Sequence, residues 1–134
     1  MGIYDFLRAV SRLKTIRRTG WVERGIDEAE SIADHSFMTA LMCMVLAEKG
    51  IDREKALKRA IIHDIAEAET GDIITKESWE KGGTMSRKEK IKLEEAALDK
   101  LMGFLGKDTA EEIRKLWKEY TEGKTKEAVF VRDI

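Results

Sequence analysis

The two histidines of this chain are the residues whose surroundings point to chemistry. His35 follows Asp34, and His63 is followed directly by Asp64. A single pair of this kind also occurs as a surface pair or as a hydrogen-bonded core histidine. Glu67 lies one helical turn after His63, so that these two side chains and Asp64 would share an arc of about 100° on a helix. Three titratable groups on one face are typical of a site built on a helix bundle.

These residue types could hold a metal ion. His63 and Asp64 on one helix, His35 on an apolar neighbour and Asp133 on a later helix would offer two imidazoles and two carboxylates to one divalent cation. The imidazoles must be neutral and the carboxylates ionised to bind it. Two histidines are too few for a histidine-rich di-iron oxygenase site, which favours hydrolysis over oxidation.

Phosphomonoester hydrolysis would use such a site directly. A metal-activated water supplies a nucleophile at neutral pH. Glu67 could hold that water or move its proton, and the planar guanidinium of Arg18 could bind two phosphate oxygens at once.

The pattern of the whole chain predicts helices to position these residues. There is no proline, and the glycines fall mostly between segments with helical periodicity. We expect helices at about 3–16, 31–50, 52–71, 86–106, 109–123 and from 125 onward. Capping signals support four of the starts: Ser31 with Asp34, Asp52, Ser86 with Glu89, and Thr109 with Glu112.

The helix at 31–50 has almost no polar face, so we expect it to be central to the fold. Cys43 with Met38, Met42 and Met44 would then fill the core. The connection at 72–85 contains a glycine doublet and is typical of a mobile lid. Trp117 and Tyr120 are interpreted as core or interface residues.

Composition limits the class of protein. The 134 residues fit one domain, over 1–134, and the helical pattern is still running at Ile134, which predicts a truncation in the last helix. With 25 basic and 26 acidic residues the net charge is -1, which offers no general attraction for a nucleic acid polymer or an anionic membrane. No apolar run reaches membrane-spanning length, and the N-terminus is unlike a signal peptide. Cys43 as the single cysteine fits a reducing compartment, so we expect a cytoplasmic protein.

Four stretches in order carry a resemblance to a known family: residues 18–21, 30–36, 63–67 and 70–73. They are similar to the HD-domain metal-dependent phosphohydrolases, and more specifically to the 5′-deoxynucleotidase, YfbR-like branch. The likeness runs from about Leu7 to the last residue. The H…HD…D signature of that family falls on His35, His63 with Asp64, and Asp133.

The resemblance implies an all-α HD-domain bundle of about six helices that hydrolyses the 5′-phosphate of (deoxy)nucleoside monophosphates. It implies one divalent transition metal, Mn, Co, Fe or Zn, on His35, His63, Asp64 and Asp133. It assigns catalytic assistance to Glu67, phosphate orientation to Arg18, sugar contacts to the stretch from Asp72 to Thr75, and a substrate-facing aromatic ring to Trp21. We also expect a homodimer, which the family and the aromatic residues on the helix surfaces both allow.

Two other functions stay open. A non-catalytic helical module could keep the HD scaffold and sense a nucleotide or join an assembly, although a decayed site would be expected to have lost a ligand or Glu67. An HD hydrolase of cyclic or alarmone nucleotides is disfavoured by the short chain without extra domains.

Overall fold

The computed structural model describes residues 2–18, 25, 29–72 and 85–134, and in these ranges the chain is all-α. Six helices of eight residues or more form the bundle, as the sequence predicts. They are α1 (Ile3–Val10), α3 (Ile32–Leu46), α4 (Arg53–Ile62), α6 (Arg87–Met102), α7 (Lys107–Glu122) and α8 (Lys126–Asp133). A short 3-10 helix η1 (Ser11–Lys14) continues α1, and the single turn α5 (Glu67–Thr70) follows α4.

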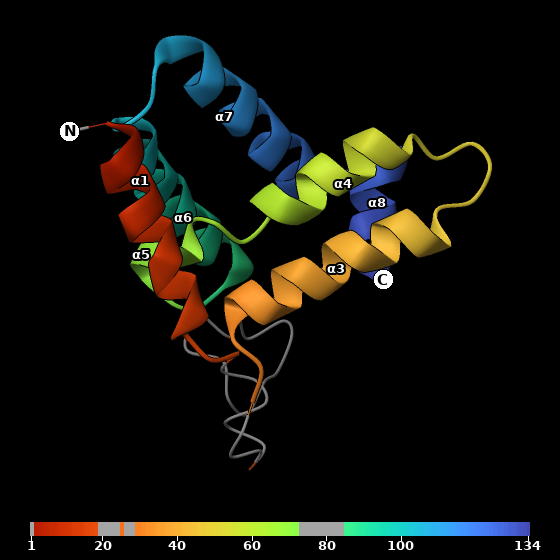
Figure 1. Cartoon of the computed structure of the whole chain (residues 1–134), viewed down its shortest axis with the longest axis horizontal. Helices are drawn as coiled ribbons and strands as arrows, with labels where there is room; N and C mark the ends of the chain where they lie inside the picture. Colours follow the sequence, from red (N-terminus) through yellow and green to blue (C-terminus); the bar gives the residue numbers. More distant parts are fainter. Residues whose placement is uncertain (1, 19–24, 26–28, 73–84) are drawn as a thin grey trace.

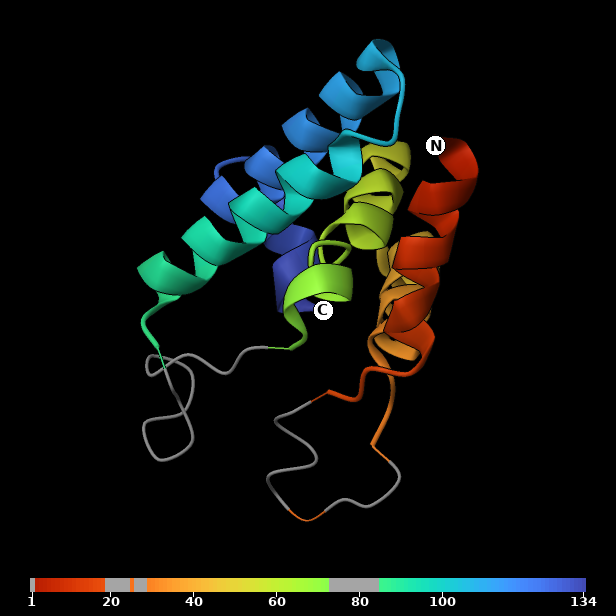
Figure 2. The same ribbon diagram turned by 90° about the vertical axis from the view of Figure 1, so that its left-hand side faces the viewer.

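The helices form two groups that meet at α4. In one group α3 packs along α4, and the short α8 packs against α4 near the C-terminus (Figure 1). In the other group α6 and α7 run side by side, with α1 and α5 against α6 (Figure 2). Because α4 contacts α3, α7 and α8, the chain that leaves its C-terminal end lies between the two groups.

Three clusters of buried apolar residues hold these elements together. The largest joins α1, α6 and α7 around Leu98, Leu101, Met102 and Trp117. A second joins α3, α4 and α8, and there Ala56 and Ala60 are fully buried beside Cys43. The small side chains of α4 thus let neighbouring helices come close. The third cluster packs η1 against the start of α3 and against α5.

Most of the predicted helix starts are confirmed by their caps. The Ser31 hydroxyl accepts from the Asp34 amide, and the Asp34 carboxylate accepts from the Ser31 amide, which completes a capping box. Asp52 and Ser86 also cap their helices. The start predicted at Thr109 is wrong, because α7 already begins at Lys107 after an extended N-cap residue.

The apolar helix α3, which the sequence predicts to be central to the fold, is buried on one side only. Cys43 is fully buried, whereas Phe37 and Val45 on the same α3 are 67% and 71% exposed. Met38 and Met44 lie partly exposed as well, so the prediction that they fill the core is wrong. A helix that is apolar all round gives no periodicity from which its outer face can be recognised.

Within the described ranges, no helix is long and apolar enough to span a bilayer. The predicted lid at 72–85 lies almost wholly outside the described residues, and so do Trp21 and Thr75.

Candidate metal centre

His63 and Asp64 project from a corner between two helices. The sequence predicts one helix from 52 to 71, but α4 ends at Ile62 and the chain turns before α5 begins at Glu67. Across the corner the backbone hydrogen bonds change to the tighter pattern in which residue i donates to residue i−3. Ile65 N donates to Ile62 O at 3.1 Å, and Glu67 N donates to Asp64 O at 3.1 Å. The predicted continuous helix is therefore wrong, although its side chains still face one site.

Tertiary packing sets this corner. Ile65 and Ala66, between the two ligand candidates and Glu67, are buried in the cluster that α1, α6 and α7 share. The bend after Ile62 thus coincides with the insertion of these two side chains into that cluster. No proline or glycine marks the bend in the sequence.

The backbone orients the His63 ring. Its Nδ1 lies 2.6 Å from the Ala60 carbonyl oxygen, which can only accept, so Nδ1 carries a proton. Its Nε2 lies 3.1 Å from Oδ2 of Asp64. Burial acts to lower the pKa of His63, but the Asp64 charge and the Ala60 carbonyl outweigh burial and raise it. Burial likewise opposes ionisation of Asp64, but His63 and His35 lower its pKa.

His35 reaches the same place from the first turn of α3. Residues 16–18 pair with residues 30–32 in a short antiparallel bridge, in which Arg18 N donates to Glu30 O at 2.9 Å. This pairing brings the side chains of Arg18 and Glu30 beside the ring. Arg18 donates to Nδ1 of His35 at 2.7 Å, and Glu30 Oε1 lies 3.6 Å from the same nitrogen. Burial and the Arg18 charge lower the pKa of His35.

The three side chains converge although 28 residues separate the two histidines. Nε2 of His35 lies 3.4 Å from Nε2 of His63 and 3.7 Å from Oδ2 of Asp64. One potential ligand atom from each residue lies within 4.8 Å of the others. Two imidazole nitrogens and a carboxylate oxygen at this spacing can coordinate one divalent transition metal.

The structure does not bring Asp133 into this cluster. Its carboxylate is exposed and lies 3.1 Å from Nε of its neighbour Arg132. Val131, Arg132 and Ile134 line the cavity in front of the histidines, so Asp133 occupies the right turn of α8 but its carboxylate is directed elsewhere.

A mostly polar cavity of about 360 Å³ opens in front of the cluster. Besides the three ligand candidates it is lined by Arg18, Glu67 and Asp72, all of which the sequence singles out. Lys90 from α6 and Tyr120 from α7 also line it. This is enough room for a phosphate group and part of a small ligand.

Glu67 is a strongly perturbed group in the cavity. It is 3% exposed, and burial, together with the charges of Asp64 and Asp72, raises its pKa to about 10. Nζ of Lys90 lies 3.8 Å from Glu67 Oε1 and acts in the opposite direction. Glu94, one turn after Lys90, is also buried, which raises its pKa to about 7. A strongly shifted carboxyl group in a cleft is a frequent mark of a functional site.

Sequence reasoning missed three residues of this site: Glu30, Lys90 and the ring of Tyr120, which packs against His63 with centroids 5.1 Å apart. A partial signal existed for the α6 wall, because Glu94 interrupts an apolar stripe that includes Ile91 and Leu98. Nothing in the sequence marks Glu30 beyond its place in the motif at 30–36.

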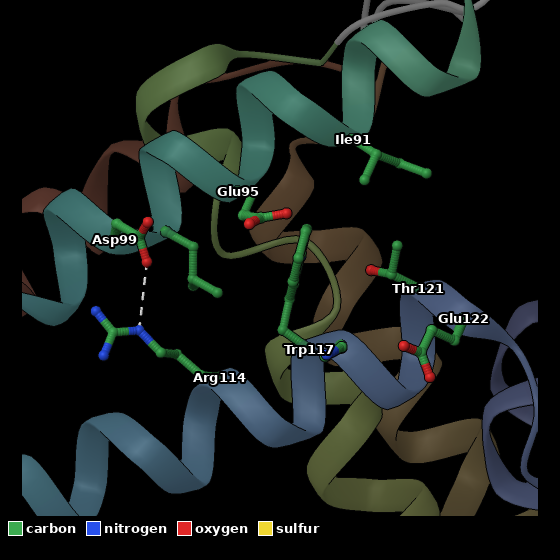
Figure 3. A pocket seen from close by; sticks show the side chains of 9 residues that line it. Ile91, Glu95, Asp99, Arg114, Trp117, Thr121 and Glu122 are labelled. Atoms are coloured by element: carbon green, nitrogen blue, oxygen red, sulfur yellow. Dashed lines mark ion pairs between the residues drawn. The ribbon is translucent and has the colours of Figure 1, made fainter.

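Another cavity, of about 320 Å³, lies between α6 and α7 on the outer side of the bundle. Figure 3 shows the Trp117 ring pointing into it, with the Asp99 and Arg114 ion pair at 3.3 Å on one side. None of the three ligand candidates lines it. The candidate ligands and the groups beside them therefore gather in the cavity in front of His35 and His63.

Comparison with known proteins agrees with this geometry. The model of the HD domain family matches residues 10–134. The chain is 39% identical to the 5′-deoxynucleotidase hdd1 of Schizosaccharomyces pombe, over 100% of this chain and 67% of that protein. It is 34% identical to the 5′-deoxynucleotidase HDDC2 of Mus musculus, over 99% of this chain and 64% of that protein. The chain thus spans about two thirds, or slightly less, of the length of these curated relatives.

A solved structure supports the same assignment. The crystal structure of the PH0347 protein from Pyrococcus horikoshii OT3 superimposes with a TM-score of 0.77 at 37% identity, covering 98% of this chain and 70% of that one. The family match over almost the whole length, with the HD dipeptide at the corner after α4, identifies this chain as a member of the HD domain family.

Proposed function

We propose that this protein is a metal-dependent phosphohydrolase that releases phosphate from (deoxy)nucleoside 5′-monophosphates. The observation that carries the proposal is the convergence of His35, His63 and Asp64 within 4.8 Å, on the wall of a cavity that also presents Arg18 and Glu67. The substrate class is supported by the relatives named 5′-deoxynucleotidase.

The donor set fits a divalent transition metal. Nδ1 of His63 is already used by the Ala60 carbonyl, which leaves Nε2 as the atom directed at Asp64 and His35. A cation bound there would lower the pKa of a coordinated water and neutralise charge on phosphate oxygens. The mixed nitrogen and oxygen donors favour Mn, Co, Fe or Zn. Asp133 is proposed as a fourth ligand on the family resemblance alone.

The other residues supply binding and proton transfer. The Arg18 guanidinium, partly exposed at the cavity wall, would bind phosphate oxygens through its planar fork. The Glu67 carboxyl group, beside Nζ of Lys90, would hold the attacking water, and it would accept a proton once a bound cation, acting with Lys90, lowers its raised pKa. Asp72 lines the same cavity and is proposed to contact the sugar, with Thr75 and with the ring of Trp21 as further substrate contacts.

Phosphate release from a panel of nucleoside monophosphates tests this function. Protein purified without added metal is analysed for bound metals, stripped with a chelator, and assayed before and after adding back Mn, Co, Fe or Zn. We expect the chelator to abolish release and one of these ions to restore it. Full activity in chelator would overturn the mechanism. Nucleotide binding without turnover would favour the non-catalytic module, and turnover of cyclic or alarmone nucleotides alone would favour the third class.

We further propose that the protein acts as a homodimer in the cytoplasm. An exposed apolar face on α3, formed by Phe37, Met38, Leu41, Met44 and Val45, supports a protein contact at this surface. Light scattering should give twice the chain mass, and Val45→Glu should reduce it toward the monomer. A monomeric parent chain at micromolar concentration would contradict the dimer.

A further inference from the structure

The surroundings of the two histidine rings differ in one respect that bears on metal binding. His63 donates from Nδ1 to a backbone carbonyl, as a metal-ligating histidine commonly does with its second nitrogen. His35 has the opposite arrangement, because its Nδ1 faces the guanidinium of Arg18 at 2.7 Å.

This contact fixes the proton on the His35 ring. A guanidinium group offers only N–H donors, so Nδ1 of His35 must accept. A neutral imidazole that accepts at Nδ1 carries its single N–H at Nε2. Yet Nε2 is the atom that faces His63 and Asp64, at 3.4 Å and 3.7 Å, and therefore the atom that a metal ion would need. In this arrangement His35 is not ready to bind.

Binding a cation at Nε2 requires the proton to move to Nδ1. The ring then donates from Nδ1, and Arg18 has no atom that can accept. Oε1 of Glu30, 3.6 Å from Nδ1, can accept instead. Glu30 already touches Arg18 at 3.1 Å, so the partners can exchange with small side-chain movements. The backbone bridge between residues 16–18 and 30–32 keeps both side chains at the ring during this exchange.

We propose that Glu30 is a positioning residue for His35, which takes the Nδ1 contact from Arg18 when the metal site is filled. This inference rests on the metal site proposed above. Its consequence is that metal loading frees the Arg18 guanidinium, on the cavity wall, for the phosphate group. Glu30 touches neither the cation nor the substrate and acts only through the orientation and the proton of His35.

Nitrogen-15 NMR of the histidine rings tests the exchange directly, because the chain has only two histidines. The metal-free protein at mildly alkaline pH should show His35 protonated at Nε2, and the zinc-loaded protein should show it protonated at Nδ1. His63 should keep its Nδ1 proton in both states and serve as the internal reference. A His35 ring already protonated at Nδ1 without metal would overturn the inference.

Zinc affinity gives a second, independent readout. Glu30→Ala should weaken zinc binding about 10-fold or more, the usual cost of removing an outer partner of a metal-bound histidine. Glu30→Gln should stay within about 3-fold of the parent chain, since its amide oxygen can still accept from an N–H donor. Arg18→Ala should bind zinc at least as tightly as the parent, because it removes the competing contact.

The control is Glu69→Ala, which removes a glutamate paired with Arg12 and Lys100 away from the cavity. It should leave zinc affinity unchanged. Equal zinc affinity of Glu30→Ala and the parent, or equal losses for Glu30→Gln and Glu30→Ala, would overturn the role of Glu30. A parent chain that binds no zinc would overturn the metal site itself, whereas zinc binding without the proton exchange overturns only this inference.

Discussion

The two halves of the candidate metal site are built in contrasting ways. His63 sits at the corner between α4 and α5, is 6% exposed, and is held by a backbone carbonyl. His35 sits in the first turn of α3, where its side chain is 24% exposed and contacts two other side chains, Arg18 and Glu30. A carbonyl in a helix cannot change its partner without unwinding the chain, whereas side chains can.

One site can thus combine a rigid half with an adjustable half. The His63 half is set by core packing of its neighbours Ile65 and Ala66, so it is formed before any ligand arrives. The His35 half depends on a charged pair held by a short bridge at the edge of the bundle. We expect substitutions in the first half to affect stability and metal binding together, and substitutions in the second half to affect metal and substrate with little loss of stability.

The largest effect is expected where the two halves meet. Asp64 lies 3.1 Å from His63 Nε2 and 3.7 Å from His35 Nε2, so Asp64→Ala removes the carboxylate that both rings share. We expect loss of stoichiometric metal and a fall in phosphate release of about 10³-fold or more. Elemental analysis and a phosphate assay measure both. The control is Asp99→Ala, which removes a carboxylate from an ion pair outside this cavity and should behave like the parent. If Asp64→Ala retained its metal, Asp64 would be excluded as a ligand.

Glu67→Gln should separate catalysis from metal binding. Glu67 lies on α5, just beyond the rigid corner, and the amide preserves its shape while removing the proton-accepting carboxylate. We expect metal content to stay constant and turnover to fall by about 10². Glu69→Gln on the same short helix is the matched control. Near-normal turnover of Glu67→Gln would remove Glu67 from the mechanism.

Arg18→Lys tests the adjustable half through the substrate. Lysine keeps the positive charge but loses the planar fork that can bind two phosphate oxygens. We expect catalytic efficiency to fall by about 10-fold, equally for all bases, with metal content unchanged. Arg17→Lys is the control, because Arg17 donates to the Ala29 carbonyl instead. Losses that depend on the base would indicate contact with the nucleoside, and no loss would indicate an ordinary surface charge.

Much of the fold could be predicted because its signals are local. Ser31 and Asp52 cap helices through contacts three residues away, and Gly123 ends α7 in the left-handed conformation at φ 65°. The bend after Ile62 could not be predicted, since packing against distant helices causes it and helical periodicity continues through it. The outer face of α3 could not be recognised either, because exposed and buried apolar residues look alike in a sequence.

The residues of the candidate site likewise fall into those that could be predicted from the sequence and those that could not. His35, His63 and Asp64 stand out because their residue types and motif spacing are rare, and the structure brings them together. Glu30 and Lys90 are common charged residues whose roles arise only from contacts with residues far along the chain or across the cavity. The role predicted for Asp133 remains a prediction, since its carboxylate pairs with Arg132.

The smallest predicted effect is a difference in stability between two histidine substitutions, measured without metal. His63→Ala removes the donor to the buried Ala60 carbonyl and the ring that packs on Tyr120, so we expect a loss of about 2 kcal/mol in the free energy of unfolding. His35→Ala removes a partly exposed ring whose partners, Arg18 and Glu30, can pair with each other, so we expect less than about 1 kcal/mol. Urea unfolding in chelator measures both, with the slope of the transition checked for each variant.

Both variants should bind metal poorly, which makes stability the property that distinguishes them. Equal losses, or a larger loss for His35→Ala, would mean that the two halves of the site are equally rigid and that the contrast between a backbone partner and side-chain partners has no energetic basis.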